Sequence, residues 1–282
     1  MHLIETAELA ALLAAGGAPV VVVDCRHDLS QPDWGRQQFA AAHIPGAVFA
    51  HLDHDLSGPV TPQSGRHPLP DPGRLAHFLG AAGVAADIHV VAYDQDKSPF
   101  AARLWWLLRW LGHARVSVLN GGLAAWAAAG LPLQGTLPPR SARPFTVLPG
   151  LTQAITTAEV AHELAAGRIL LLDARAADRF AGRNETLDAV AGHVPGARNQ
   201  PFALNLDGDG RLRTAAALAS QWQAVLGDTP PAQVVAMCGS GVTACHNLLA
   251  MEVAGLPGAR LYAGSYSEWI RDPSRQVATG PA

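Results

Sequence analysis

Short, continuous hydrophobic runs rich in valine, leucine and isoleucine recur along the chain, and longer stretches of helical character separate them. Six such runs begin at Val20, His89, Val116, Ile169, Gln233 and Ala259. Unbroken apolar runs are typical of strands that are buried on both faces of a parallel sheet. Their alternation with helices predicts an α/β fold in which a parallel sheet is flanked by helices.

Two helix starts can be recognised from their capping residues. The sequence TTAE at residues 156–159 fits a capping box that begins at Thr156, and Pro72 follows Asp71 as a first-turn proline. A third helix is expected over residues 243–252, directly after a glycine-containing turn.

The chain also repeats itself. The sequence VVVVDCR at residues 20–26 returns as ILLLDAR at residues 169–175, and HIPGA at 43–47 returns as HVPGA at 193–197. Further matches follow in the same order and with nearly the same spacing. This pattern indicates a tandem duplication, and it predicts two similar α/β domains.

The predicted domain boundaries follow from a proline-rich stretch between the repeats. Residues 132–150 carry five prolines and are interpreted as a linker. We therefore expect a non-catalytic N-terminal domain over residues 1–131 and a C-terminal catalytic domain over residues 151–282.

Composition narrows the class of protein. The 282 residues are 49% hydrophobic and 15% charged, which is enough apolar material for a sizeable core, and the net charge of −3 does not favour binding to nucleic acid or to an anionic membrane. No signal peptide or membrane span is apparent. Three cysteines without a CxxC pair fit a reducing compartment, so a cytoplasmic location is expected.

One cysteine stands where a catalytic group is expected. Cys238 ends an apolar run at the carboxyl edge of the predicted sheet, and Gly239 and Gly241 allow the following backbone to turn its N–H groups inward. Those groups and the start of the next helix would favour a thiolate. The alternative is a small core residue, which is the interpretation for Cys25 and Cys245.

The duplication supplies an internal comparison for this loop. Position 94 corresponds to Cys238 but holds an aspartate, and the residues after Asp94 lack the two glycines. We therefore expect thiol chemistry in the second repeat only.

The loop CGSGVTA at residues 238–244, together with HIPGA and HVPGA, resembles the two-domain rhodanese family over nearly the whole chain. The resemblance implies two tandem rhodanese-like domains, with the C-terminal one catalytic. Cys238 would take sulfane sulfur from a donor, become a persulfide, and pass the sulfur to thioredoxin, a small thiol or cyanide, without a metal or organic cofactor. The loop residues Gly239, Ser240, Gly241, Val242 and Thr243 would bind the substrate.

The resemblance also implies roles outside the loop. Ser240 would share a polar relay with Asp53 and His67, and Arg179 would bind the carboxylate of the donor. Gly239 and Ser240 replace the basic residues found in thiosulfate-specific members, which favours 3-mercaptopyruvate as donor and leaves thiosulfate as the alternative.

The chain departs from the family pattern at two places. The matching position for a second substrate arginine is not an arginine, and Arg183 is nearby but displaced. The sequence YAGSY at residues 262–266 lacks the usual aspartate and tryptophan, so looser packing around the cysteine loop is expected.

Single features of the sequence also raise three other functions. A cysteine phosphatase needs an arginine where Ala244 stands, which argues against that activity. The sequence HLDHD at residues 51–55 could bind a metal, although no partner cluster is apparent. A non-catalytic interaction module is the alternative from another class.

Overall fold

The computed structural model describes residues 1–16, 19–136 and 141–281. These residues form two compact units, and each unit takes a short segment from the other half of the sequence. The first unit comprises Met1–Gly58, Pro70–Leu151 and Gly208–Leu212, and the second comprises Pro59–Leu69, Thr152–Asp207 and Arg213–Ala282. The simpler division at residues 132–150 stays a prediction.

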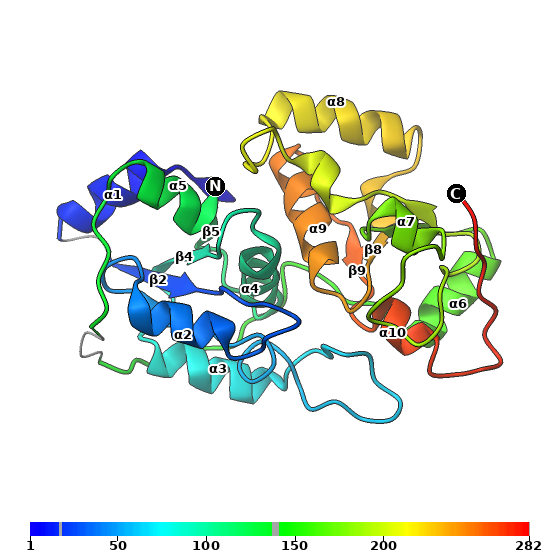
Figure 1. The fold of residues 1–282 in the computed structure, drawn as a ribbon, viewed down its shortest axis with the longest axis horizontal. Helices are drawn as coiled ribbons and strands as arrows, with labels where there is room; N and C mark the ends of the chain where they lie inside the picture. The colour runs from blue at the N-terminus through cyan, green and yellow to red at the C-terminus, as the bar shows by residue number, and fades with distance from the viewer. Residues whose placement is uncertain (17–18, 137–140, 282) are drawn as a thin grey trace. The chain divides into compact units, whose positions relative to one another are not determined.

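The first unit is built on a five-stranded parallel sheet in the order β1-β5-β4-β2-β3. Its strands are β1 (Leu3–Ile4), β2 (Val20–Asp24), β3 (Val48–Phe49), β4 (His89–Tyr93) and β5 (Val116–Leu119). The helices are α1 (Thr6–Ala14), α2 (Trp34–Ala41), α3 (Pro72–Ala81), α4 (Pro99–Trp110) and α5 (Gly122–Ala128). Figure 1 shows α1 and α5 on one side of the sheet and α2 and α3 on the other.

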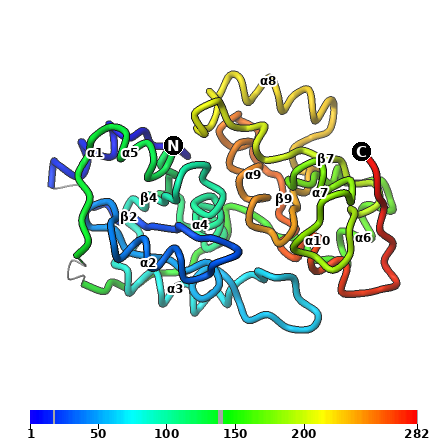
Figure 2. The backbone as a smooth tube through the Cα atoms, viewed as in Figure 1, coloured from blue at the N-terminus to red at the C-terminus, as the bar shows by residue number. Residues whose placement is uncertain are grey.

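The second unit has a four-stranded parallel sheet in the order β7-β6-β8-β9. Its strands are β6 (Leu170–Asp173), β7 (Arg198–Asn199), β8 (Val234–Met237) and β9 (Arg260–Leu261). The α-helices are α6 (Thr157–Ala165), α7 (Ala177–Phe180), α8 (Ala215–Leu226), α9 (Thr243–Val253) and α10 (Ser265–Trp269), and two 3₁₀ turns span Phe202–Asn205 and Pro231–Gln233. In Figure 2 the trace of α8 runs outside α9, which it contacts.

The predicted α/β class and parallel sheets are confirmed. All six hydrophobic runs contain strands, since buried β-branched and leucine side chains fill both faces of each sheet. The two-residue strands β1, β3 and β7 were not predicted, because they are too short to produce a pattern.

The capping predictions are also confirmed. Thr156 and Glu159 form the reciprocal capping box of α6, and the carboxylate of Asp71 accepts the N–H of Arg74 at the start of α3. The third expected helix is α9, which begins at Thr243.

The repeated motifs build the same framework in both units. Asp24 and Asp173 end their strands, and each carboxylate accepts hydrogen bonds from the arginine two residues later. The motif histidines stack on phenylalanine rings, His43 on Phe39 at 4.0 Å and His193 on Phe180 at 3.8 Å between centroids. These motif residues therefore stabilise the fold.

The proline-rich stretch belongs to the first unit and is bonded to the rest of it. Gln134 and His43 exchange backbone hydrogen bonds of 2.9 Å, and the N–H of Arg143 donates to the carbonyl of Gly80. Pro138 and Pro139 lie outside the described residues. Among the described helices, none combines the length and the apolar character needed to cross a bilayer.

Candidate active site

Cys238 directly follows the carboxyl end of β8, and α9 begins five residues later. Figure 1 labels both elements in the second unit. It is buried, and its Sγ accepts a hydrogen bond of 3.1 Å from the N–H of Gly241. A backbone donor at this distance stabilises negative charge on sulfur. The loop thus has the geometry expected from its glycines.

Gly241 is required by its conformation and by its surroundings. Its φ of +79° lies in the left-handed region, and an added Cβ would overlap the carbonyl oxygen of Ala263. After this turn, Val242 caps α9 and Thr243 is its first residue. The turn therefore brings the N–H of Gly241 back to Cys238.

The segment after Tyr262 holds the loop tightly, so the expectation of looser packing is wrong. Ser265 Oγ accepts the backbone N–H of Cys238 at 3.0 Å and donates to the carbonyl of Tyr262. The N–H groups of Tyr266 and Ser267 donate to the carbonyls of Cys238 and Gly239. Ser265 reaches this position with a left-handed φ of 53°, a strain that these hydrogen bonds offset.

Ser240 and His67 are brought together as expected. The hydroxyl oxygen of Ser240 lies 2.7 Å from Nδ1 of His67, and both side chains are buried. His67 belongs to Pro59–Leu69, the first-repeat segment that forms part of the second unit. A hydroxyl and an imidazole in this contact can pass a proton between them.

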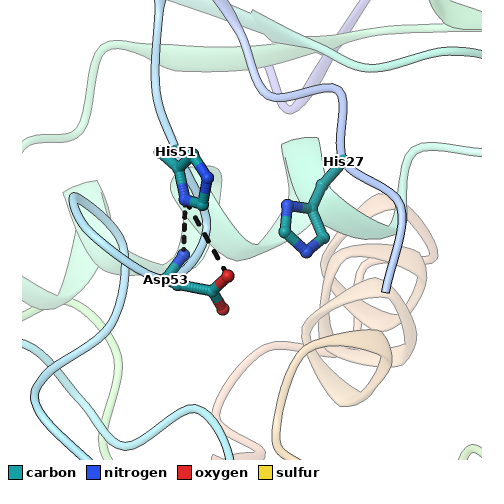
Figure 3. A group of neighbouring side chains, drawn as sticks. All are labelled: His27, His51 and Asp53. Atoms are coloured by element: carbon teal, nitrogen blue, oxygen red, sulfur yellow. Dashed lines mark hydrogen bonds and ion pairs between the residues drawn. The ribbon is translucent and has the colours of Figure 1, made fainter. Parts of the chain in front are cut away.

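Asp53, the third residue of the predicted relay, belongs to the first unit. Its surroundings there are two histidines: the Asp53 N–H donates to Nδ1 of His51 at 3.1 Å, and His27 lies beside them (Figure 3). Its place in the relay stays a prediction.

Among the described residues, His27, His51 and Asp53 form a group whose potential metal-ligand atoms all lie within 4.8 Å of one another. The sequence drew attention to His51 and Asp53 but missed His27, which follows a different strand. The distance from His51 Nδ1 to Asp53 Oδ2 is 3.9 Å, whereas ligand atoms of a tetrahedral zinc site lie about 3.4 Å apart. His51 Nδ1 also already accepts the Asp53 N–H, so the lone pair that a metal would use is engaged.

Arg179 lies beside the cysteine loop and is paired with acids. An added Cβ at Gly239 would be 3.6 Å from its Nη2 atom. The same guanidinium donates to Glu185 at 2.7 Å and approaches Asp188 at 3.3 Å. Burial opposes ionisation of Glu185, but hydrogen bonds from Arg179 and the backbone outweigh it, so its pKa lies below the ordinary value. Arg179 is thus both an ion-pair partner and a neighbour of the loop.

Arg66 is a site residue that sequence reasoning missed. Its Nη1 forms an ion pair with Asp188, and its Nη2 would lie 2.8 Å from a Cβ at Gly239. Arg66 and Asp188 are 122 positions apart, so periodicity and spacing gave no signal. The one available hint was that Arg66 directly precedes His67.

Cys25 and Cys245 are buried, as is Cys238, so burial alone does not distinguish the three. Cys245 lies within α9 and its Sγ contacts the carbonyl of Gly241 at 3.3 Å. Burial raises the pKa of Cys25 well above its ordinary value, which keeps that thiol protonated. In both residues the thiol donates to a backbone carbonyl, of Val23 for Cys25 and of Gly241 for Cys245.

In the first unit the corresponding loop is filled by the carboxylate of Asp94. Its oxygens accept the N–H groups of Ser98 and Phe100 at 2.9 Å and of Ala101 at 3.1 Å, at the start of α4. Burial raises the pKa of Asp94 to about 6 against these donors. A resident side-chain anion therefore occupies the cradle that a substrate would need.

The fold and the site define a parallel α/β protein of two repeats, with a cysteine facing backbone N–H groups in the second. The profile of the family described as Rhodanese-like domain matches residues 5–129 and 156–272. The chain belongs to this family, and the domain is present twice.

Relatives with similar sequences or structures cover nearly the whole chain. A "Probable 3-mercaptopyruvate sulfurtransferase" of Pseudomonas aeruginosa is 49% identical over 283 residues, covering 99% of this chain and 98% of that protein. A thiosulfate sulfurtransferase of Bos taurus is 34% identical over 292 residues, covering 99% and 95%. The solved 3-mercaptopyruvate sulfurtransferase from Leishmania major has a TM-score of 0.83 and 33% identity, covering 95% of this chain and 74% of its own. All three are named as sulfurtransferases, so the reading as a non-catalytic interaction module gains no support.

Proposed function

We propose that this protein is a sulfurtransferase that moves sulfane sulfur from 3-mercaptopyruvate to a thiol or cyanide through a persulfide on Cys238. The observation that carries the proposal is the hydrogen bond from the Gly241 N–H to Cys238 Sγ at the end of β8. The name of the Pseudomonas aeruginosa relative supports the choice of donor.

The chemistry begins with attack of the Cys238 thiolate on the donor sulfur. A sulfur–sulfur bond forms while the carbon–sulfur bond of 3-mercaptopyruvate breaks, and the electron pair leaves as the enolate of pyruvate. The enolate needs a proton, and Ser240 in contact with His67 at 2.7 Å can deliver it. An acceptor thiolate or cyanide then attacks the outer sulfur and restores Cys238.

The N–H of Gly241 has a role in both half-reactions. A persulfide is anionic at its outer sulfur and, once that sulfur has been transferred, the charge returns to Sγ. A fixed donor stabilises these charges without reorganisation. Gly239, Val242 and Thr243 are proposed to shape the same cradle.

Whole-protein mass spectrometry tests the reaction class. After incubation with 3-mercaptopyruvate, the wild-type chain should gain one sulfur atom, and added cyanide should remove it. The variant Cys238→Ser should gain none, while Cys245→Ser should behave as the wild type does. Sulfur loading that persists in Cys238→Ser would contradict the proposal.

Thiosulfate is the second candidate donor. The observation in its favour is that two guanidinium groups, of Arg66 and Arg179, adjoin Gly239, and such charges attract a dianion. The bovine relative carries that name. Values of kcat/KM for the two donors, measured with cyanide as common acceptor, decide between them, and a higher value for thiosulfate would replace 3-mercaptopyruvate in the proposal.

We also propose that the protein works in the cytoplasm. The three cysteines are all unpaired thiols, as a reducing compartment maintains them. Measuring activity and labelled protein in fractionated cells tests this, and enrichment outside the cytoplasmic fraction would contradict it.

A further inference from the structure

Two guanidinium groups adjoin the residue that follows the candidate nucleophile. The position of an added Cβ at Gly239 lies 2.8 Å from Nη2 of Arg66, and 3.6 and 3.7 Å from Nη2 and Nη1 of Arg179. Any side chain at position 239 would therefore meet Arg66 first. Glycine there leaves the space in front of both cations open.

One carboxylate holds the two arginines together. Oδ1 of Asp188 pairs with Arg66, while Oδ2 lies 3.3 Å from Arg179. Burial raises the pKa of Asp188, and the charge of Arg66 acts in the opposite direction. Asp188 thus fixes the separation of the two guanidinium groups through its own two oxygens.

The cations and the acids of this cluster differ in exposure. Arg66 is 26% and Arg179 20% exposed, but the side chains of Asp188 and Glu185 are only 3% and 2% exposed. The two carboxylates are therefore buried, whereas part of each arginine side chain remains exposed. Such an arrangement favours an incoming anion even though the formal charges cancel.

We infer that Arg66 is a specificity-determining residue, which together with Arg179 binds the carboxylate of the sulfur donor beside Cys238. It supplies the second cation that the sequence lacks near Arg179, while Arg183 is exposed and its backbone N–H bonds to Asp178. The identification of this anion as a sulfur donor rests on the proposed function. The recognition of a carboxylate next to Cys238 is independent of the proposed function.

Alkylation of Cys238 tests carboxylate recognition separately from sulfur transfer. Iodoacetate carries a carboxylate and iodoacetamide is its neutral amide, so the ratio of their rates at Cys238 reports the cation pair and cancels changes in thiol accessibility. The rates are followed by mass spectrometry of the peptide that contains Cys238. The variants are Arg66→Ala, Arg66→Lys and the control Arg260→Ala, whose guanidinium is 20% exposed and paired with Glu163.

The rate ratio should fall about tenfold in Arg66→Ala, less in Arg66→Lys, and stay at the wild-type value in Arg260→Ala. KM for 3-mercaptopyruvate should rise in the same order. An unchanged rate ratio in Arg66→Ala would overturn the inference. If the ratio falls but no variant or wild-type protein transfers sulfur, the proposed function fails and the role of Arg66 stands.

Discussion

The imidazole Nδ1 of His67 lies 2.7 Å from the hydroxyl oxygen of Ser240, in a contact between residues 173 positions apart. Ser240 is two residues from Cys238, so this contact brings a titratable ring to the cysteine loop. Ser240 and His67 can transfer a proton, which a loop that only binds an anion through its backbone N–H groups cannot do. It also makes the two candidate donors experimentally distinguishable.

Replacing Ser240 by alanine should affect the two donors differently. Pyruvate enolate must be protonated at carbon, whereas sulfite leaves thiosulfate as a stable anion, so kcat for 3-mercaptopyruvate should fall on the order of 100-fold with little change for thiosulfate. Steady-state kinetics with cyanide as acceptor measures both. Ser265→Ala is the matched hydroxyl control: its Oγ binds the backbone of Cys238, so its loss should reduce both activities alike. Equal losses in Ser240→Ala would assign that hydroxyl a structural role.

Replacing Gly241 by alanine should destabilise the chain and stop sulfur loading. The left-handed φ and the overlap with the carbonyl of Ala263 together should cost on the order of 2 kcal/mol or more in the free energy of unfolding. Gly255→Ala is the control, because Gly255 has a similar φ of +76° but no atom within 4 Å of an added Cβ. It should cost about 1 kcal/mol and leave loading intact. Urea unfolding and mass spectrometry give both quantities, and similar effects at the two positions would refute the packing argument.

Replacing Asp94 by asparagine should alter how stability depends on pH. The pKa of Asp94 rises from 3.8 to about 6 on folding, so between these values the unfolded chain releases its proton first. The wild-type protein should therefore lose stability as pH rises through this window, by on the order of 2–3 kcal/mol, and the loss should end above it. Asp94→Asn lacks this contribution.

The difference in unfolding free energy between wild type and Asp94→Asn isolates the group from other titrations. Urea denaturation at several pH values from 4 to 7 measures it. A difference that stays constant over this range would show that Asp94 titrates at its ordinary pKa.

Removing metal ions should leave sulfur transfer unchanged. Burial lowers the pKa of His51, which keeps the ring neutral, and its Nδ1 accepts the Asp53 N–H, so the ring proton resides on the buried Nε2. Dialysis against a chelator followed by the kinetic assay tests this. Loss of activity that zinc restores, or stoichiometric metal in the purified protein, would establish a metal site at His27, His51 and Asp53.

The sequence was sufficient for the parts of the structure that depend on local pattern. Buried strands such as β2 and β8 have continuous apolar runs, and the turn at Gly241 follows from a residue that tolerates positive φ. The contact of Ser240 with His67 was anticipated only through the resemblance to a family. Nothing in the spacing of the two residues indicates it.

What the sequence could not predict depends on contacts between distant segments. Arg66 and Asp188 lie in different repeats, and each has the appearance of an ordinary surface charge in its own neighbourhood. Ion pairs of this kind follow from three-dimensional packing, which leaves no periodic trace. The hydrogen bond from the Cys238 N–H to Ser265 was missed for the same reason, although Ser265 stands in a segment that the sequence had marked as unusual.

The assignment of Pro59–Leu69 to the second unit has a consequence for how this gene can evolve. A duplicated chain usually retains the option of being divided again into two independent products. Here a break between the repeats would leave Arg66 and His67 in one product and Cys238 in the other. During synthesis, too, His67 leaves the ribosome long before Ser240, so the site is completed only when nearly the whole chain has been made. The two repeats must therefore be encoded in one chain for this site to form.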